Sequence, residues 1–323
     1  MKTMTSRFNS AKNIAVSVGF LSLLAPLSAY AGTTTIFAPG VTFESGWYDV
    51  NKKSTEHRPQ KDFAYCWAAT ASNLIRWWQD RYVASGAELP DSVPDGKTSA
   101  LGYSCGIFDI FLDENNWNHV VNGSPRGADP HVALKWYFNG ENHNFTGTYA
   151  VPISGTGGFW GTEYVGLQSA LGHNFIGNEI QYYSSWGPWA EDQSKSGLEI
   201  FSGYVRDLLS KGAAGMAIQV AIAGGLHAVT LWGADFDAAG LVTAVYMTDS
   251  DDAAKTLLQS GLRKYSVTTD SFNRSVSLKD SDYGTVAITG LTGLTAYPVP
   301  EPSVFGLLAG LGAFALIVSR RRR

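Results

Sequence analysis

Three side chains in this sequence have the types and spacing that nucleophilic catalysis requires. Cys66 lies at the start of a segment with helical periodicity, where the positive end of a helix dipole favours the nucleophilic thiolate. His227 and Asp249 lie at the far ends of two strand-like runs that flank the turn Asp237–Gly240. In an antiparallel hairpin centred on that turn, His227 lies opposite Asp249, and Asp251 is equally close. A histidine beside a carboxylate supplies the general base of a Cys-His-Asp relay.

Each of these features also has a purely structural interpretation. A lone cysteine is more often a small buried apolar residue, or here half of a disulfide with Cys105. The pair His227 and Asp249 also fits a polar contact at the edge of a sheet. The residues alone leave these alternatives open.

The elements that must position these residues are helices followed by strands. Apolar residues at helical spacing, without Gly or Pro, predict a helix over Cys66–Tyr82, and a second amphipathic helix is predicted over Leu198–Leu209. Strand-like runs follow at Met216–Ile222, Ala228–Trp232 and Leu241–Thr248. This order predicts the α+β class with an antiparallel sheet.

Other matches to known chemistry fail on their context. Gly102–Gly106 fits the Gly-x-Ser-x-Gly elbow of serine hydrolases. That fold needs a histidine after the catalytic acid, but the last histidine here, His227, precedes Asp249. The acidic run 249–252 lacks the glycine and glutamate of a calcium loop. The other histidines lack zincin spacing, so we interpret them as loop or surface residues: His57, His119, His131, His143 and His173. The stretch Tyr137–Trp189, rich in Gly, Asn, Ser and aromatic residues, is predicted to form short strands and long loops, or an insertion.

Composition limits the functional classes. The chain has 323 residues, with 24 Lys+Arg, 28 Asp+Glu and a net charge of −4, a length that allows one large domain or two small ones. Hydrophobic residues at 45% are enough for a packed core. Without a basic excess, nucleic-acid binding is excluded. Two cysteines are too few for a disulfide scaffold or a four-cysteine zinc site.

The start of the chain has the pattern of a targeting segment. Three basic residues precede the apolar run Ile14–Leu27, and the small-x-small triplet Ala29-Tyr30-Ala31 follows it. This order predicts a secretory signal peptide over residues 1–31.

The end of the chain has a second targeting pattern. Pro-Glu-Pro at 300–302 precedes the apolar stretch Ser303–Ser319 and four arginines, and the stretch is at the lower limit of a bilayer span. A plain tail anchor is one interpretation. The three-part order resembles the PEP-CTERM sorting signal, which implies processing by an exosortase-type enzyme over 299–323 and export to the cell envelope. Without the seven basic residues and one acidic residue of the two ends, the domain over 32–298 has a net charge of −10.

Two blocks of the sequence resemble the IdeS/Mac family of secreted bacterial cysteine endopeptidases. The first runs from Gly46-Trp47-Tyr48-Asp49 through Lys52 to Cys66–Asn73, and the second from His227 to Asp251. The resemblance implies a papain-like α+β fold, in which the catalytic helix on the N-terminal side packs on an antiparallel sheet. It is weak between 84 and 198, where recognition loops would lie.

The resemblance also assigns roles to the candidate residues. Cys66 would be the nucleophile and His227 its general base, while Asp249 would orient His227 and Asp251 would support the pair. Lys52 matches the side chain that contributes to the family's oxyanion hole, beside the backbone N–H of the cysteine.

Gln60 is a rival for the oxyanion role. It lies six residues before Cys66, a spacing that resembles papain itself. Lys52 is preferred because its flanking motif also matches the family.

We therefore predict a secreted or envelope-associated cysteine endopeptidase that hydrolyses a protein substrate through a thioester, with no metal and no organic cofactor. Immunoglobulin is not assumed as the substrate. One alternative is acyl transfer to an amine, a transglutaminase- or amidase-like activity of the same triad. The other is an inactive matrix or adhesive protein on this scaffold, which a Cys66–Cys105 disulfide would mark.

Overall fold

The structure is a computed structural model that describes residues 32–52, 64–97, 105–121, 124–142, 149–171, 176, 196–219, 225–251, 261–270 and 275–299. The chain divides into two units, Met1–Gly32 and Thr33–Arg323, and all elements below lie in the second. The predicted signal peptide, Gln60 and the predicted C-terminal span lie outside the described residues. Within the described ranges, no helix has the length and apolarity that crossing a bilayer requires.

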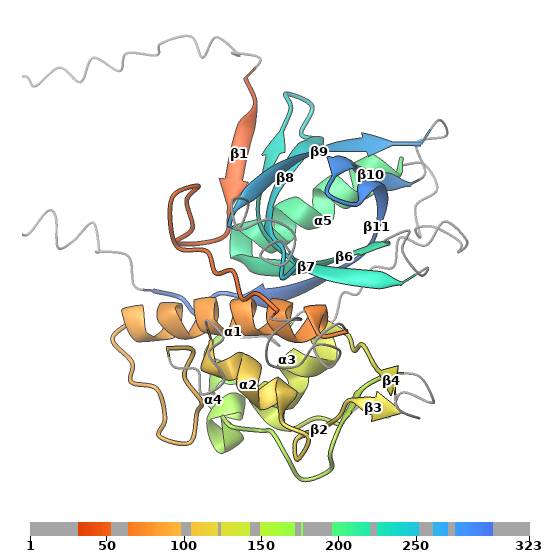
Figure 1. Cartoon of the computed structure of the whole chain (residues 1–323). Coiled ribbons are helices and arrows are strands. Elements are labelled where there is room, and N and C mark those ends of the chain that lie inside the picture. Colours follow the sequence, from red (N-terminus) through yellow and green to blue (C-terminus); the bar gives the residue numbers. More distant parts are fainter. Residues whose placement is uncertain are drawn as a thin grey trace, which may run out of the picture. The chain divides into compact units, whose positions relative to one another are not determined.

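An antiparallel β-barrel forms the larger part of the described fold. Its six strands follow one another in the order β7 (Leu226–Phe236), β6 (Gly212–Gln219), β11 (Gly284–Thr295), β10 (Val276–Ser281), β9 (Arg263–Thr269) and β8 (Val242–Thr248). The last strand, β8, also pairs with the first, β7, and this pairing closes the barrel (Figure 1). A seventh strand, β1 (Thr34–Phe37), pairs with the second half of β7, beyond the part that pairs with β6.

Register shifts help these strands to curve. The pairing of β7 with β8 shifts after Leu231 and again after Asp235, and the pairing of β11 with β6 shifts after Ile288. Each such irregularity bends the strand and increases its twist, which lets a sheet coil until its edges meet.

The predicted α+β, papain-like fold, with the helix of Cys66 packed on an antiparallel sheet, was wrong. The main sheet of the described residues is a closed six-stranded barrel, and five helices accompany it. The prediction failed because the sequence after Thr248 was not recognised as strand-forming. Strands β9, β10 and β11 add the three strands with which the sheet closes.

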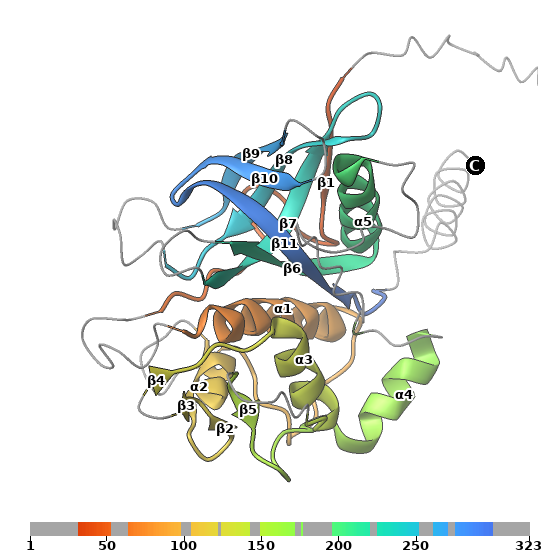
Figure 2. The same ribbon diagram turned by 90° about the vertical axis from the view of Figure 1, so that its right-hand side faces the viewer.

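The described residues form five helices, α1 (Cys66–Ala84), α2 (Gly106–Leu112), α3 (Pro130–Asn139), α4 (Gly161–Leu171) and α5 (Gly197–Lys211). Helix α1 lies between the barrel and helices α2 and α3 (Figure 2). Four two-residue strands form two small ladders, β2 (Trp117–Asn118) with β5 (Val151–Pro152) and β3 (Val120–Val121) with β4 (Ser124–Pro125).

Helix α1 reaches the barrel through a glycine and an asparagine. A Cβ on Gly215 of β6 would lie 2.8 Å from the Thr70 side chain, so glycine permits the close approach. The buried Asn73 side chain donates to Thr230 Oγ1 of β7 at 2.9 Å and accepts from the Val50 N–H at 2.9 Å. One side chain therefore ties the helix to the barrel and to the segment that precedes the helix.

Replacing Asn73 with alanine is expected to lower the free energy of unfolding by about 2–3 kcal/mol, because it leaves a buried N–H and a buried hydroxyl without these partners. Urea unfolding followed by circular dichroism measures the change. The matched control is Asn118→Ala at an exposed position, expected to change stability by less than about 0.5 kcal/mol. Equal losses in the two variants would contradict the role given to Asn73.

The helical side of the core is built from aromatic rings. Trp67 of α1 lies 4.6 Å from Trp117 between ring centroids, and Trp160 is buried as a core residue. The prediction of a loop or surface position was wrong for His131, which is buried in α3 with 7% of its surface exposed, whereas His119 lies in the loop between β2 and β3 but is also buried, at 2%. The ring of His119 packs 5.0 Å from Tyr65, which is the kind of apolar contact that periodicity does not reveal.

Candidate active site

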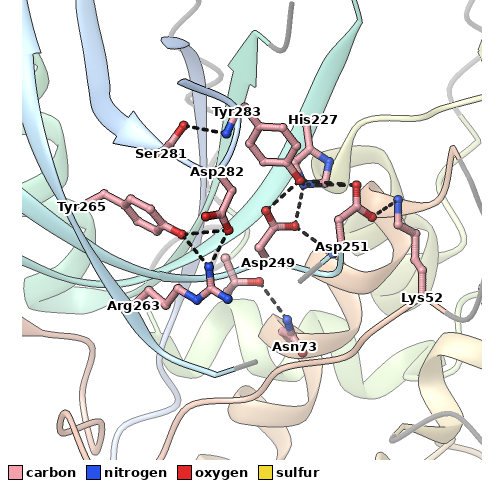
Figure 3. Close-up of polar contacts among 11 residues, drawn as sticks. Lys52, Asn73, His227, Asp249, Asp251, Arg263, Tyr265, Ser281, Asp282 and Tyr283 are labelled. Atoms are coloured by element: carbon pink, nitrogen blue, oxygen red, sulfur yellow. Dashed lines mark hydrogen bonds and ion pairs between the residues drawn. The ribbon is translucent and has the colours of Figure 1, made fainter. Parts of the chain in front are cut away.

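Segments far apart in the sequence meet at one end of β7. Cys66 is the first residue of α1, and His227 is the second residue of β7. Asp249 and Asp251 follow the end of β8, and Lys52 lies in the segment before α1. Figure 3 shows the last four of these side chains grouped together. The structure thus places all five predicted site residues in one neighbourhood.

The histidine contacts the first of the two carboxylates. His227 Nε2 lies 2.7 Å from Asp249 Oδ1 and 4.0 Å from Asp251 Oδ2. The pairing Thr230↔Thr248, continued by three residues, puts Asp251 opposite His227 in register. The contact with Asp249 is therefore made by a side chain that reaches across the register, and it buries both partners.

The surroundings of the Cys66 thiol favour the thiolate, its nucleophilic form. Burial raises its pKa, but a hydrogen bond with His227 and the positive charges of His227 and Lys52 outweigh burial and lower the pKa below its ordinary value. The Ala228 backbone also hydrogen-bonds the sulfur. Since His227 Nε2 contacts Asp249, the nitrogen left to face the thiol is Nδ1.

The histidine and its carboxylate form an ion pair. Burial by itself would lower the pKa of His227, but the Asp249 charge and its hydrogen bond raise the pKa well above its ordinary value. Burial would likewise raise the pKa of Asp249, and the His227 charge lowers it instead. Both shifts favour the charged forms, an imidazolium beside a carboxylate.

Lys52 is a buried cation beside this group. Its Nζ lies 2.5 Å from Asp251 Oδ1, and the residue is 6% exposed. Burial would lower the pKa of Lys52, but the charges of Cys66 and Asp251 raise it. The backbone fixes its place, because the Lys52 N–H donates to the Ser250 carbonyl at 2.9 Å and Thr248 Oγ1 donates to the Tyr48 carbonyl at 2.8 Å.

The chain matches a known protein family in two blocks of its sequence. Residues 28–88 and 193–289 match the family model described as Mac 1. Over these two blocks the chain is similar to the Mac-1 family, and we call the domain that contains both blocks the Mac-1 domain. Its two matched blocks hold Lys52, Cys66, His227 and both aspartates, together with α1, α5 and the barrel strands except the end of β11. The predicted resemblance to the IdeS/Mac family is confirmed.

Two further matches concern the C-terminal segment of the chain and a related protein. Residues 298–323 match the PEP-CTERM protein-sorting motif, which confirms the predicted sorting signal and indicates export and sorting to the envelope. The chain is 27% identical over 252 residues to an IgM protease of Streptococcus suis (strain P1/7), an alignment that covers 75% of this chain and 20% of the relative. The chain thus spans about a fifth of that relative's length.

The Mac-1 domain contains one more polar group that the sequence did not reveal. Tyr283, in the turn between β10 and β11, donates its hydroxyl to Asp249 Oδ2 at 2.9 Å and lies 3.2 Å from His227 Nε2. No local pattern marks it, because it reaches the site only through closure of the barrel. Gln60, the rival to Lys52, lies outside the described residues.

The same cluster has metal-ligating atom types. One donor atom from each of His227, Asp249 and Asp251 lies within 4.8 Å of the others. These atoms already have partners of the opposite kind, since Lys52 Nζ contacts Asp251 and the Tyr283 hydroxyl contacts both carboxylates. Because side-chain donors already contact these ligand atoms, we do not assign this cluster as a metal site.

The second cysteine lies outside both the site and the blocks that match the family. Cys105 is the residue before α2 and is fully buried, and both it and Cys66 are free thiols. Burial raises the pKa of Cys105, the opposite direction to Cys66. The two thiols therefore differ in the property that makes a cysteine nucleophilic.

Proposed function

We propose that the Mac-1 domain is a cysteine endopeptidase in which Cys66 is the nucleophile, His227 the general base and acid, and Asp249 the residue that orients the histidine. The observation that carries the proposal is the continuous contact from the Cys66 thiol through His227 to Asp249 in a buried site. A thiolate whose pKa is lowered by an adjacent imidazolium is the nucleophile that acyl transfer requires.

The first half of the proposed reaction forms an acyl-enzyme. The Cys66 thiolate attacks the carbonyl carbon of the scissile peptide, and the carbonyl oxygen takes up the negative charge. Lys52 and the Cys66 backbone N–H stabilise this oxyanion, as the proximity of the Lys52 charge to the sulfur supports. The His227 imidazolium then gives its proton to the leaving amine, and the C–N bond breaks to leave a thioester.

The second half regenerates the thiol. Neutral His227 accepts a proton from a water molecule, whose oxygen attacks the thioester carbonyl. The C–S bond breaks, the carboxylic acid product leaves, and the Cys66 thiolate and His227 imidazolium are restored. Asp249 keeps its charge throughout and stabilises the imidazolium at each stage.

The substrate class we propose is protein. The relative named an IgM protease supports peptide hydrolysis, but this chain aligns with only 20% of that relative. The stretch 89–192, which contains α2, α3 and α4, also lies outside the family match. We therefore assign no immunoglobulin specificity to this chain.

The proposed chain has three segments, as expected for an exported peptidase. We propose a signal peptide over 1–31, the peptidase domain over 32–298, and a sorting signal over 299–323 that an exosortase-type enzyme processes. The match of the sorting motif to residues 298–323 supports the last of these segments.

The inactive-scaffold alternative loses its simplest mark, because Cys66 and Cys105 are free thiols. No contact in the described residues favours acyl transfer to an amine over transfer to water. Partition of the acyl-enzyme between water and an added amine separates those two activities.

Iodoacetamide alkylation tests the proposal on the intact chain. Cys66 is expected to react at least about tenfold faster than Cys105 near neutral pH, because the pKa of Cys66 is lowered and that of Cys105 is raised. Mass spectrometry of digested peptides measures both rates in one sample. As the pH rises toward about 9, the ratio of the two rates is expected to shrink.

The same sample also links the thiol to activity. Cleavage of a denatured protein mixture should fall in proportion to the fraction of Cys66 alkylated, while alkylation of Cys105 should not affect it. Equal reactivity of the two thiols, or cleavage that survives full alkylation of Cys66, overturns the proposal.

A further inference from the structure

The Tyr283 hydroxyl lies against three groups of the proposed site. It donates to Asp249 Oδ2 at 2.9 Å, and it lies 3.2 Å from His227 Nε2 and 3.4 Å from Asp251 Oδ2. Its ring lies beside the imidazole, with centroids 5.3 Å apart (Figure 3). A single hydroxyl therefore touches the histidine and both carboxylates.

This hydroxyl completes the coordination of the Asp249 carboxylate. Oδ1 contacts His227 Nε2 at 2.7 Å and accepts the Asp251 backbone N–H at 2.9 Å, whereas Oδ2 accepts the Tyr283 hydroxyl. The Tyr283 hydroxyl gives its one hydrogen to Asp249 Oδ2, and its oxygen lies 3.2 Å from His227 Nε2, which contacts Asp249 Oδ1 more closely. Both carboxylate oxygens are thereby fixed, and rotation of the group away from the histidine is opposed.

Like charges surround this position. Asp251 and Asp49 are the carboxylates that face Asp249, and the balancing cation, Lys52, contacts the far oxygen of Asp251. Tyr283 supplies a hydrogen-bond donor between Asp249 and Asp251, where two carboxylates would otherwise repel. A connected series of contacts thus runs from the lysine through both carboxylates to the histidine.

The turn that carries Tyr283 is itself fixed. Ser281 Oγ donates to the Gly284 carbonyl at 2.5 Å and accepts the Tyr283 N–H at 3.3 Å. Gly284 has a φ of +82°, which favours glycine. Arg263 of β9 contacts the Asp282 carboxylate at 2.5 Å, so a neighbouring strand holds the turn from the other side.

We propose that Tyr283 is a positioning residue of the Mac-1 site: its hydroxyl holds Asp249 against His227 and bridges Asp249 to Asp251. It acts through Asp249 and does not touch the reacting atoms. The inference rests on the proposed function, but its test reads the Cys66 thiol directly and needs no substrate.

The test compares the pH dependence of iodoacetamide alkylation of Cys66 in the wild-type chain and in Tyr283→Phe. Without the hydroxyl, Asp249 is held less firmly against His227 and stabilises the imidazolium less, so the Cys66 thiolate loses part of the stabilisation that the imidazolium gives it. The midpoint of Cys66 ionisation is expected to move up by about one pH unit, so the rate falls about tenfold on the acid side and little at about pH 9.

Tyr246→Phe is the matched control. Its hydroxyl contacts Asp235, a carboxylate on β7 that also pairs with Lys264 away from Cys66, so the alkylation profile is expected to stay unchanged. A Tyr283→Phe profile that superimposes on wild type, or that falls equally at every pH, overturns the positioning role. If the profile moves as expected but neither chain cleaves protein, the proposed function fails while the inference about Tyr283 stands.

Discussion

Replacing Cys66 with alanine is expected to abolish cleavage of a denatured protein mixture, a loss of at least about 10⁴-fold in rate. The reason is that the proposed reaction passes through a covalent thioester, and the other described thiol, Cys105, lies outside the site. The rate at which new N-termini appear measures the loss. Because the side chain is small and lies at the first turn of α1, the variant is expected to fold as the wild type does.

Two further variants separate the chemistry of the thiol from its packing. Cys66→Ser keeps the shape, but an alcohol is far less acidic than a thiol, so its activity is expected to fall nearly as far as that of the alanine variant. Cys105→Ala also removes a buried thiol, yet it is expected to lose stability without losing activity per folded molecule. Substantial cleavage by Cys66→Ala, or a loss in Cys105→Ala as large as in Cys66→Ala, would remove Cys66 from the role of nucleophile.

The grouping of the site residues followed from local patterns. Cys66 begins a helix because fifteen or more residues without Gly or Pro follow it at helical spacing, and the helix found spans Cys66–Ala84. His227 and Asp249 meet because one tight turn joins their strands, and a turn fixes register over a short distance. Features encoded within one helix or one hairpin are the ones that a single sequence reveals.

The closure of the sheet and the position of Tyr283 were not predictable in this way. Strands β9 to β11 were not recognised from their sequences. The pairing of β11 with β6 joins segments that are distant in the sequence. Tyr283 enters the site because that closure brings the β10–β11 turn to the end of β7. Long-range pairing depends on the packing of the whole barrel, which no local period reports.

Lys52 is expected to have the second-largest effect. Replacing it with methionine, which keeps most of the apolar stem, should lower the rate of protein cleavage by about 10²–10³-fold, the usual cost of removing one oxyanion donor. The change also leaves Asp251 without the cation that contacts it at 2.5 Å. A matched control is Lys264→Met, which breaks a lysine–aspartate contact on the barrel surface and is expected to leave the rate within about twofold.

Alkylation separates the two contributions that Lys52 makes. The lysine charge helps to lower the pKa of Cys66, so Lys52→Met should slow iodoacetamide alkylation at acid pH. Alkylation forms no oxyanion, however, so at about pH 9, where the thiol is ionised anyway, its rate should fall by less than about tenfold while protein cleavage stays strongly reduced. A loss of the same size in both reactions would mean that Lys52 only tunes the thiol. In that case Gln60→Ala, expected to matter little if Lys52 is the donor, becomes the variant that should abolish cleavage, because an oxyanion in a buried site needs a donor from some side chain.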